Sequence, residues 1–186
     1  MKEVQPIRDK EKIEAVKDVL KRSSYRDWFL FTLGINTGLR VGDLLKLKVK
    51  DVKGKTHLIL VEQKTENTRK SRKTKRFRLN NNAQELIEEY TERMKEDDWL
   101  FPSRLGDKAI SRVQAYRILN KAAKEVGLTE IGTHTMRKTF GYHFYQKTKD
   151  ATLLQEIFGH SAPSVTLRYI GINQDIIDKA IDNFSL

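Results

Sequence analysis

The sequence predicts a mainly α-helical domain of the α+β class, with a small antiparallel β-sheet inserted as a hairpin. Most of the 186 residues follow apolar patterns with helical spacing. Residues 57–64 instead form an apolar, β-like run, and residues 75–80 alternate polar and apolar side chains with a period of two. Because no segment rich in Gly, Ser or Pro divides the chain, which has only 3 Pro, we expect a single domain over residues 1–186.

The first helices are predicted by apolar spacing and by the residues that end them. A stripe at positions i, i+3 and i+7 predicts the first helix, and residues 25–35 are apolar enough to form a buried second helix. The serines at 23–24 can cap the second helix, and Gly38 stops it. A short helix is expected over 41–47, before the hairpin. The stripe of the first helix consists of Ile13, Val16 and Leu20.

Capping residues predict the helices of the second half. One of the asparagines at 81–82 can cap a helix over 83–95. Ser111 is a suitable cap for a helix that ends at Gly127, after a loop over 102–107. Further helices are expected after Thr133, Asp150, Pro163 and Asn173.

The last segment, residues 172–184, predicts an amphipathic helix over about 173–184. Its apolar side chains fall on one face, and its aspartates lie elsewhere. Such a helix docks either on its own domain or on a neighbouring copy, as a swapped element that would make the protein a homo-oligomer. The apolar face holds Ile172, Ile176, Ile177, Ala180, Ile181 and Phe184.

The charge of the chain indicates a polyanionic partner. The net charge is +11, and residues 64–78 alone carry eight basic residues and one acid, a net +7. A basic run can be a solvated loop, but its β-like flanks place this one on a hairpin that could follow phosphates along a nucleic-acid groove. The expected DNA contacts are Arg69, Lys70, Arg72, Lys73, Lys75 and Arg76.

Composition excludes several classes of site. The chain has no cysteine, and its 4 histidines form no His-x-x-x-His pair, which argues against disulfides and zinc. The acids lie mostly among Lys and Arg, and no Gly-rich nucleotide loop occurs. We expect neither metal nor cofactor. No apolar run approaches the roughly 20 residues of a membrane span, and the amino terminus lacks a signal sequence. A cytoplasmic, DNA-associated protein without a membrane partner is expected.

Two arginines and a histidine stand out by position. Arg40 follows the glycine turn after a buried helix, where burial needs an anionic partner, either a ligand or Asp43. His134 and Arg137 are spaced i and i+3, so on a helix they share a face. Thr133 could cap that helix and leave both residues near its electropositive end, where a phosphate binds favourably.

His160 and Tyr169 complete the candidates. Gly159 can supply a left-handed helix terminus, which leaves His160 in a defined turn. The alternative for His160 is a histidine that complements the helix dipole, and the alternative for Tyr169 is ordinary packing.

In their order and spacing, these motifs resemble the catalytic domain of the tyrosine recombinase (phage integrase) family. The resemblance extends from about residue 7 to the end of the chain. It implies the fold of that domain and a reaction that breaks and rejoins double-stranded DNA through a 3′-phosphotyrosyl link, without metal or ATP. The matching motifs are TGLRVGDLLKLK at 37–48, QKT at 63–65, HTMR at 134–137, FGHS at 158–161 and SVTLRY at 164–169.

The resemblance also assigns roles at the phosphate. Arg40 and Arg137 match the arginines that grip the scissile phosphate, and Asp43 matches an acid that supports the first of them. Lys64 matches the hairpin lysine that protonates the leaving 5′ oxygen. Neighbouring lysines of the hairpin are alternatives for that role, namely Lys70, Lys73 and Lys75.

The nucleophile and the two histidines follow in the same way. Tyr169 matches the nucleophile of the family, and His134 and His160 match two further catalytic groups. Because a phenol has a pKa of about 10, its oxygen must lose a proton as it attacks, with help from nearby cations and a base such as His134.

The chain also departs from the family pattern. Lys138 stands where a histidine often follows the arginine, and Phe158 stands where leucine is usual. The N-terminal DNA-clamping domain of the family is expected to be absent, as in an excised catalytic domain or a short member. The alternatives to a recombinase are a non-catalytic DNA-binding module of the same fold and a type IB topoisomerase-like enzyme. The DNA target, and the choice between integration, excision, inversion and dimer resolution, stay open.

Overall fold

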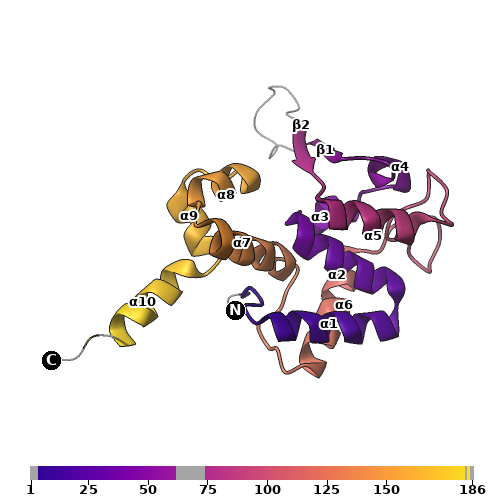
Figure 1. Ribbon diagram of the computed structural model, residues 1–186. Helices are drawn as coiled ribbons and strands as arrows, with labels where there is room; N and C mark the ends of the chain where they lie inside the picture. Colours follow the sequence, from indigo (N-terminus) through magenta and orange to yellow (C-terminus); the bar gives the residue numbers. More distant parts are fainter. Residues whose placement is uncertain (1–3, 62–73, 183, 185–186) are drawn as a thin grey trace.

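The computed structural model describes residues 4–61, 74–182 and 184, and confirms the predicted class. It is mainly helical, with one two-stranded antiparallel sheet (Figure 1). The first part comprises α1 (Lys10–Ser23), α2 (Tyr25–Thr37), α3 (Val41–Leu44), α4 (Val49–Val52), β1 (His57–Val61) and β2 (Thr74–Arg78). The second part comprises α5 (Asn81–Thr91), α6 (Arg112–Glu125), α7 (Thr135–Thr148), α8 (Ala151–Phe158), α9 (Pro163–Tyr169) and α10 (Ile172–Asp182).

Helix α2 is the centre of the larger core. Its side chains from Phe29 to Leu33 are buried, and α1, α5, α6 and α7 all pack against it. The approach of α7 is close, since a Cβ at Gly34 would lie 2.5 Å from the sulfur of Met136. The helix ends as predicted, at Gly38 in the left-handed conformation (φ 66°).

The hairpin follows the predicted antiparallel pairing, with His57 opposite Arg78 and Val61 opposite Thr74. Several local boundaries differ from the prediction. Helix α3 ends at Leu44, and α4 was not predicted, because four residues give no helical period. Helix α5 is capped by Asn80, whose side-chain oxygen accepts a hydrogen bond from the amide of Ala83 at 2.8 Å, so the predicted cap at 81–82 is wrong.

A second, smaller core joins α7, α8 and α9. Its buried members are Leu154, Phe158, Ile170 and Ile172. In Figure 1, helices α7 to α10 form one side of the molecule, and α1 to α6 with the hairpin form the other. Gly141 lets α7 approach, because a Cβ there would lie 2.7 Å from Ile170 and 2.8 Å from the Phe158 ring. This smaller core carries most of the candidate site.

Helix α10 leaves this core after its first turn and extends away from the rest of the chain (Figure 1). Ile172 is 3% exposed, whereas Ile181 is 65% and Phe184 is 69% exposed. The amphipathic pattern therefore has buried apolar contacts at its start and exposed ones at its end. None of the helices in the described residues is long and apolar enough to cross a membrane.

Candidate active site

Arg137 is the buried centre of the candidate site. It lies in the first turn of α7 and is 5% exposed. Its Nη1 donates to the carbonyl of Gly38 at 2.7 Å, and its Nη2 donates to the carbonyl of Phe158 at 2.8 Å. The guanidinium also lies over the Phe158 ring, 4.0 Å from its centroid. One side chain thus ties α7 to the ends of α2 and α8, and its orientation is fixed.

The turn at Gly38 explains the TGLR motif. A Cβ at Gly38 would lie 2.4 Å from the Phe140 ring, and the backbone there has a positive φ, so two independent constraints require glycine. The turn presents one carbonyl to Arg137 and leads directly to Arg40. Contrary to the burial considered from the sequence, Arg40 is exposed, and among the described ion pairs none joins it to Asp43.

Tyr169 lies at the end of α9, where it meets the start of α7. Its hydroxyl is 3.2 Å from Nδ1 of His134, within hydrogen-bond distance. Burial raises the pKa of Tyr169, and the positive charges of Arg137 and Arg40 act against that rise. The two arginines therefore favour the phenolate that the surrounding protein disfavours.

His134 is the N-cap residue of α7, without a side-chain capping bond, so the predicted cap at Thr133 is wrong. The pKa of His134 is lowered, first by the protein that encloses part of the ring and then by the charges of Arg137, Lys138 and Arg40. A neutral imidazole is therefore favoured beside the Tyr169 hydroxyl. Arg137 is affected in the same direction, since burial is the main cause that lowers its pKa to about 10 and the charge of Arg40 adds to it.

His160 is another polar side chain that lies next to Tyr169. Gly159 ends α8 in the left-handed conformation, as predicted, and His160 follows it. The His160 ring meets the Tyr169 ring edge-on, with 5.1 Å between centroids. Its Nδ1 lies 3.0 Å from Oγ1 of the buried Thr166, which orients the imidazole.

Lys138 is a site residue whose role the sequence did not predict. It is 6% exposed, and its ammonium lies over the Tyr169 ring, 5.1 Å from the centroid. The sequence signal was its place directly after Arg137, at the position where the chain departs from the family pattern. Its contact with Tyr169 arises only when α7 and α9 pack together.

The structure thus brings together five of the predicted residues around one hydroxyl group. The Tyr169 oxygen lies beside an imidazole whose lowered pKa favours its neutral form. The Lys138 ammonium lies over the Tyr169 ring, and the charges of Arg137 and Arg40 act on the phenol. Such a set can bind the oxygens of a phosphate and promote attack by the phenol oxygen on its phosphorus atom. The five residues are Arg40, His134, Arg137, His160 and Tyr169.

The hairpin candidates are mostly outside the described residues. Lys64, Arg69, Lys70, Arg72 and Lys73 all fall there, and for Lys75 only its backbone position in β2, opposite Leu60, is described. Arg76 is exposed, and its Nη2 lies 3.2 Å from Nδ1 of His57.

Within the described ranges, no group of three or more His, Asp or Glu side chains could hold a metal ion.

The amino-acid sequence is similar to a family model and to known recombinases. A family model described as the phage integrase family matches residues 8–175. Probable integrase/recombinase YoeC of Bacillus subtilis (strain 168) is 54% identical over 172 residues, which are 92% of this chain and 92% of that protein. Tyrosine recombinase XerC of Thermodesulfovibrio yellowstonii is 31% identical over 159 residues, 80% of this chain and 50% of the relative. The chain therefore spans nearly all of the first and about half of the second.

Solved structures share the fold. The crystal structure of XerA recombinase gives a TM-score of 0.74 at 18% identity, over 100% of this chain and 68% of that one. XerH site-specific recombinase, bound to its palindromic difH substrate in a post-cleavage complex, gives 0.72 at 21% identity, over 98% and 54% of the two chains. The predicted recombinase-like catalytic fold is confirmed.

Proposed function

The chain belongs to the phage integrase family, and we propose that residues 1–186 form the catalytic domain of a tyrosine recombinase that cuts and rejoins duplex DNA. The observation that carries the proposal is the Tyr169 hydroxyl, 3.2 Å from His134 and subject to the charges of Arg137 and Arg40. A protein that only binds DNA has no need of a tyrosine in such surroundings. The names of the relatives, integrase and tyrosine recombinase, support the same activity.

In the proposed reaction, the Tyr169 oxygen attacks the phosphorus of a phosphodiester. The new O–P bond links Tyr169 to the 3′ phosphate, and the bond from phosphorus to the 5′ oxygen breaks. His134 accepts the phenol proton, and its lowered pKa keeps the imidazole unprotonated near neutral pH. Lys64, from the hairpin, gives a proton to the departing 5′ oxygen. Resealing is the reverse, so the energy of the phosphodiester is kept in the covalent link and neither metal nor ATP is required.

The arginines stabilise the charge that builds on the non-bridging oxygens. Arg137 uses two of the five donors of its guanidinium on the carbonyls of Gly38 and Phe158. A further hydrogen bond joins Arg137 to Tyr169. We propose that the remaining donors bind a phosphate oxygen, and the fixed orientation limits the reorganisation needed when charge develops. Arg40, exposed at the turn, is able to close on the phosphate from solvent. His160 provides a further donor at the same oxygens.

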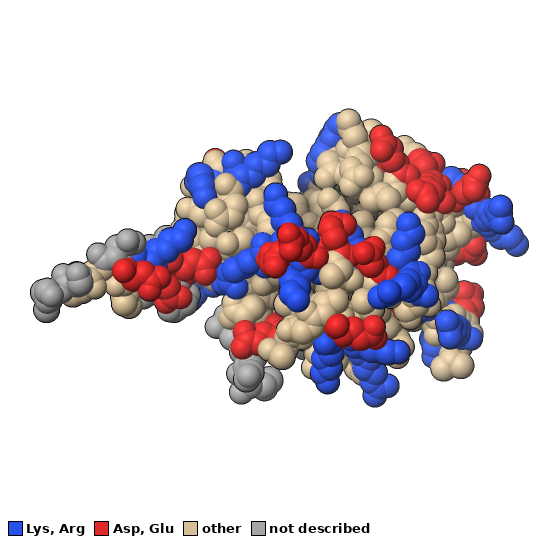
Figure 2. All heavy atoms as spheres, turned by 60° about the horizontal axis from the view of Figure 1, so that its bottom comes forward, with Lys and Arg blue, Asp and Glu red and all other residues tan. Residues whose placement is uncertain are grey.

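Duplex DNA is the proposed substrate, and the palindromic difH substrate bound by XerH supports this proposal. The basic hairpin, residues 64–78, supplies most of the surplus positive charge of the chain. On the face drawn in Figure 2, Lys and Arg are interspersed with Asp and Glu. In its described residues, that face has no continuous positively charged patch to bind DNA. We therefore propose that the DNA lies over the hairpin, Arg40 and Tyr169.

A second copy of the chain is the proposed occupant of the free end of α10. Ile181 and Phe184 are 65% and 69% exposed, so two large apolar side chains at this end of the chain are in contact with water. Docking in trans would bury both and would link protomers on DNA. It would also favour a recombinase over a topoisomerase-like enzyme, which needs no partner.

The test is to trap the covalent intermediate. A pool of duplexes with a randomised core and a nick is incubated with the protein, so the unknown target sequence is sampled. We expect a DNA-linked protein band that survives denaturant, is absent with Tyr169→Phe, and persists with the control Tyr145→Phe, in which the tyrosine of α7 is changed. Equal adduct from Tyr169→Phe would show that another residue is the nucleophile. Binding without adduct from the parent would favour the non-catalytic DNA-binding module.

A further inference from the structure

Residues 5–8 are fixed along α7, the helix that carries Arg137 and begins at His134. Both backbone polar groups of Ile7, which is 2% exposed, are bonded by side chains of α7. Its amide donates to Oγ1 of Thr139 at 2.9 Å, and its carbonyl accepts from Nε2 of His143 at 3.0 Å. The segment is therefore attached to the second and third turns of α7, directly after the turn that carries Arg137.

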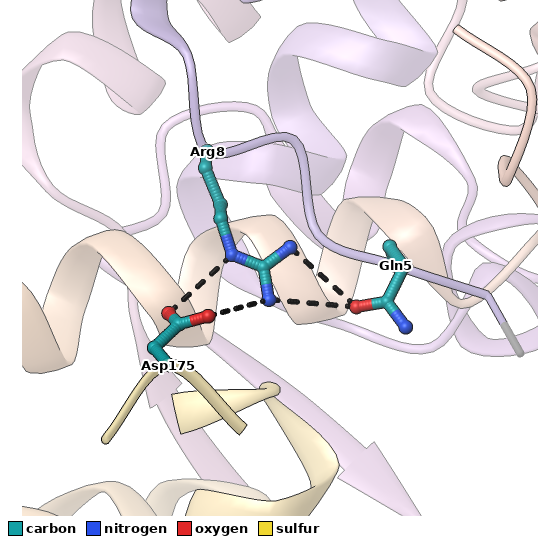
Figure 3. Close-up of polar contacts among 3 residues, drawn as sticks. All are labelled: Gln5, Arg8 and Asp175. Atoms are coloured by element: carbon teal, nitrogen blue, oxygen red, sulfur yellow. Dashed lines mark hydrogen bonds and ion pairs between the residues drawn. The ribbon is translucent and has the colours of Figure 1, made fainter. Parts of the chain in front are cut away.

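Arg8, the next residue, reaches from this segment to α10. Figure 3 shows its guanidinium between Gln5 and Asp175, a residue in the first turn of α10. Nη2 lies 3.1 Å from Oδ1 of Asp175, and Nε donates to Oδ2 at 3.4 Å. The Gln5 side-chain oxygen accepts at 3.5 Å, and the guanidinium lies over the Tyr142 ring of α7, 5.4 Å from its centroid. This two-point contact is half-buried and geometrically specific.

Arg8 also packs on the turn that follows Tyr169. Gly171 has a φ of 79°, and a Cβ there would lie 2.7 Å from Nη2 of Arg8. On both sides of Gly171 the chain is held in the smaller core, with Ile170 at 0% and Ile172 at 3% exposed. The turn from α9 to α10 is thus enclosed by the core on one side and by Arg8 on the other.

We infer that Arg8 is a positioning residue for Tyr169, acting through Asp175 and the turn at Gly171. Because Arg8 is fixed to α7 through Ile7 and Tyr142, it sets α9 relative to α7, and so sets the Tyr169 hydroxyl relative to His134 and Arg137. A displacement of residues 5–8 is transmitted to the nucleophile by the same contacts. The effect on catalysis rests on the proposed function. The claim that Arg8 holds the turn at Gly171 does not depend on it.

The test compares Arg8→Gln and Asp175→Asn with the charge exchange Arg8→Asp/Asp175→Arg. The matched control is Lys17→Gln, which removes the ion pair of Lys17 with Glu14 on α1, also on the surface. At saturating duplex, the single variants are expected to form adduct about 10- to 10²-fold more slowly, since a misplacement of reacting groups by about 1 Å can cost about 10²-fold. DNA affinity is expected to be unchanged, and the exchange variant to recover part of the rate.

A second measurement needs no DNA. Hydrogen–deuterium exchange of the amides at 170–175 is expected to be faster in Arg8→Gln and unaltered in Lys17→Gln. An unchanged adduct rate in Arg8→Gln would overturn the inference, and so would a rate loss that accompanies faster exchange throughout α7. If the parent forms no adduct with any duplex, the proposed function fails. In that case an unchanged exchange rate of the amides at 170–175 in Arg8→Gln would overturn the claim that Arg8 holds the turn, and a faster exchange rate would support it.

Discussion

The Tyr169 hydroxyl lies 3.2 Å from Nδ1 of His134, a residue 35 positions earlier in the chain. The contact joins the end of α9 to the start of α7, so it depends on the packing of the smaller core. It also brings together two groups whose pKa values shift in opposite directions. Burial raises the pKa of the phenol, whereas burial and nearby cations lower that of the imidazole. Both shifts favour the neutral forms of the two side chains, so the proposed proton transfer depends on the positive charges of Arg137 and Arg40, which favour the phenolate.

The pH dependence of adduct formation is expected to report His134. Its lowered pKa lies below the ordinary value of about 6.5, so the imidazole is a free base at pH 7 and becomes protonated only in more acidic solution. The adduct rate is therefore expected to be independent of pH just below 7 and to fall at lower pH. His134→Ala should lower the rate by roughly 10²–10⁴-fold and abolish this acid limb.

The control for this profile is His57→Gln. The pKa of His57 is lowered too, by burial first and then by Arg76 and Arg78, but the residue belongs to the hairpin. The substitution should leave the acid limb of the rate unchanged. An acid limb that persists in His134→Ala would assign the proton transfer to another group.

Substitutions of the two arginines are expected to differ in their effect on the free energy of unfolding, although both should abolish cleavage. Arg137→Ala leaves the carbonyls of Gly38 and Phe158 without their donors, at a cost of about 1–3 kcal/mol for each buried group. Arg40→Ala changes an exposed side chain, so its effect on unfolding is expected to stay within about 0.5 kcal/mol. Urea unfolding beside the adduct assay separates the two effects. Equal destabilisation by both changes would contradict the structural role given to Arg137.

Lys64 is expected to be dispensable when the leaving group needs no acid. In a duplex with sulfur in place of the scissile 5′ oxygen, the leaving group is a thiolate, whose conjugate acid has a pKa of about 8.5. Lys64→Ala should therefore cleave ordinary DNA slowly and the sulfur-substituted DNA at the parental rate. The controls are Lys70→Ala and Lys73→Ala. If only Lys70→Ala or only Lys73→Ala cleaves the sulfur-substituted DNA at the parental rate but ordinary DNA slowly, that lysine is the general acid.

The basic hairpin is expected to set the salt dependence of binding. Changing Lys70, Lys73 and Arg76 together to Ala should weaken DNA binding and reduce the slope of log affinity against log salt by about 0.9 for each phosphate that the protein no longer neutralises. The control changes Lys10, Lys17 and Lys21 of α1 to Gln, which alters net charge by the same amount on a helix away from the hairpin. If both triple variants reduce the slope equally, the result would contradict a specific contact between the hairpin and the DNA phosphates.

The helices were predictable where apolar spacing and capping residues agree. Ile13, Val16 and Leu20 are buried on α1 as expected, and Gly38 and Gly159 end their helices in the left-handed conformation. Helix α4 could not be predicted, since its cap consists of a local bond from the Lys48 amide to the Asp51 carboxylate that no periodicity signals.

The candidate site was predictable as a set of residues but not as a geometry. The shared helix face of His134 and Arg137 is a local property that singled out Arg137, whereas Tyr169 was identified through the resemblance to the tyrosine recombinase family. The burial of Arg137 on two carbonyls depends on the meeting of α2, α7 and α8, and the contact of Lys138 with Tyr169 depends on α9. The pair of Arg8 and Asp175 spans 167 positions, and no local pattern encodes it.

The identity of the residue that carries DNA is the most direct test of the proposed reaction. After trapping, the adduct is digested with nuclease and protease and analysed by mass spectrometry. The predicted product is the peptide that contains Tyr169, with a nucleotide attached to the tyrosine oxygen through its 3′ phosphate. A nucleotide on any other residue, or a link through a 5′ phosphate, would contradict the proposed reaction.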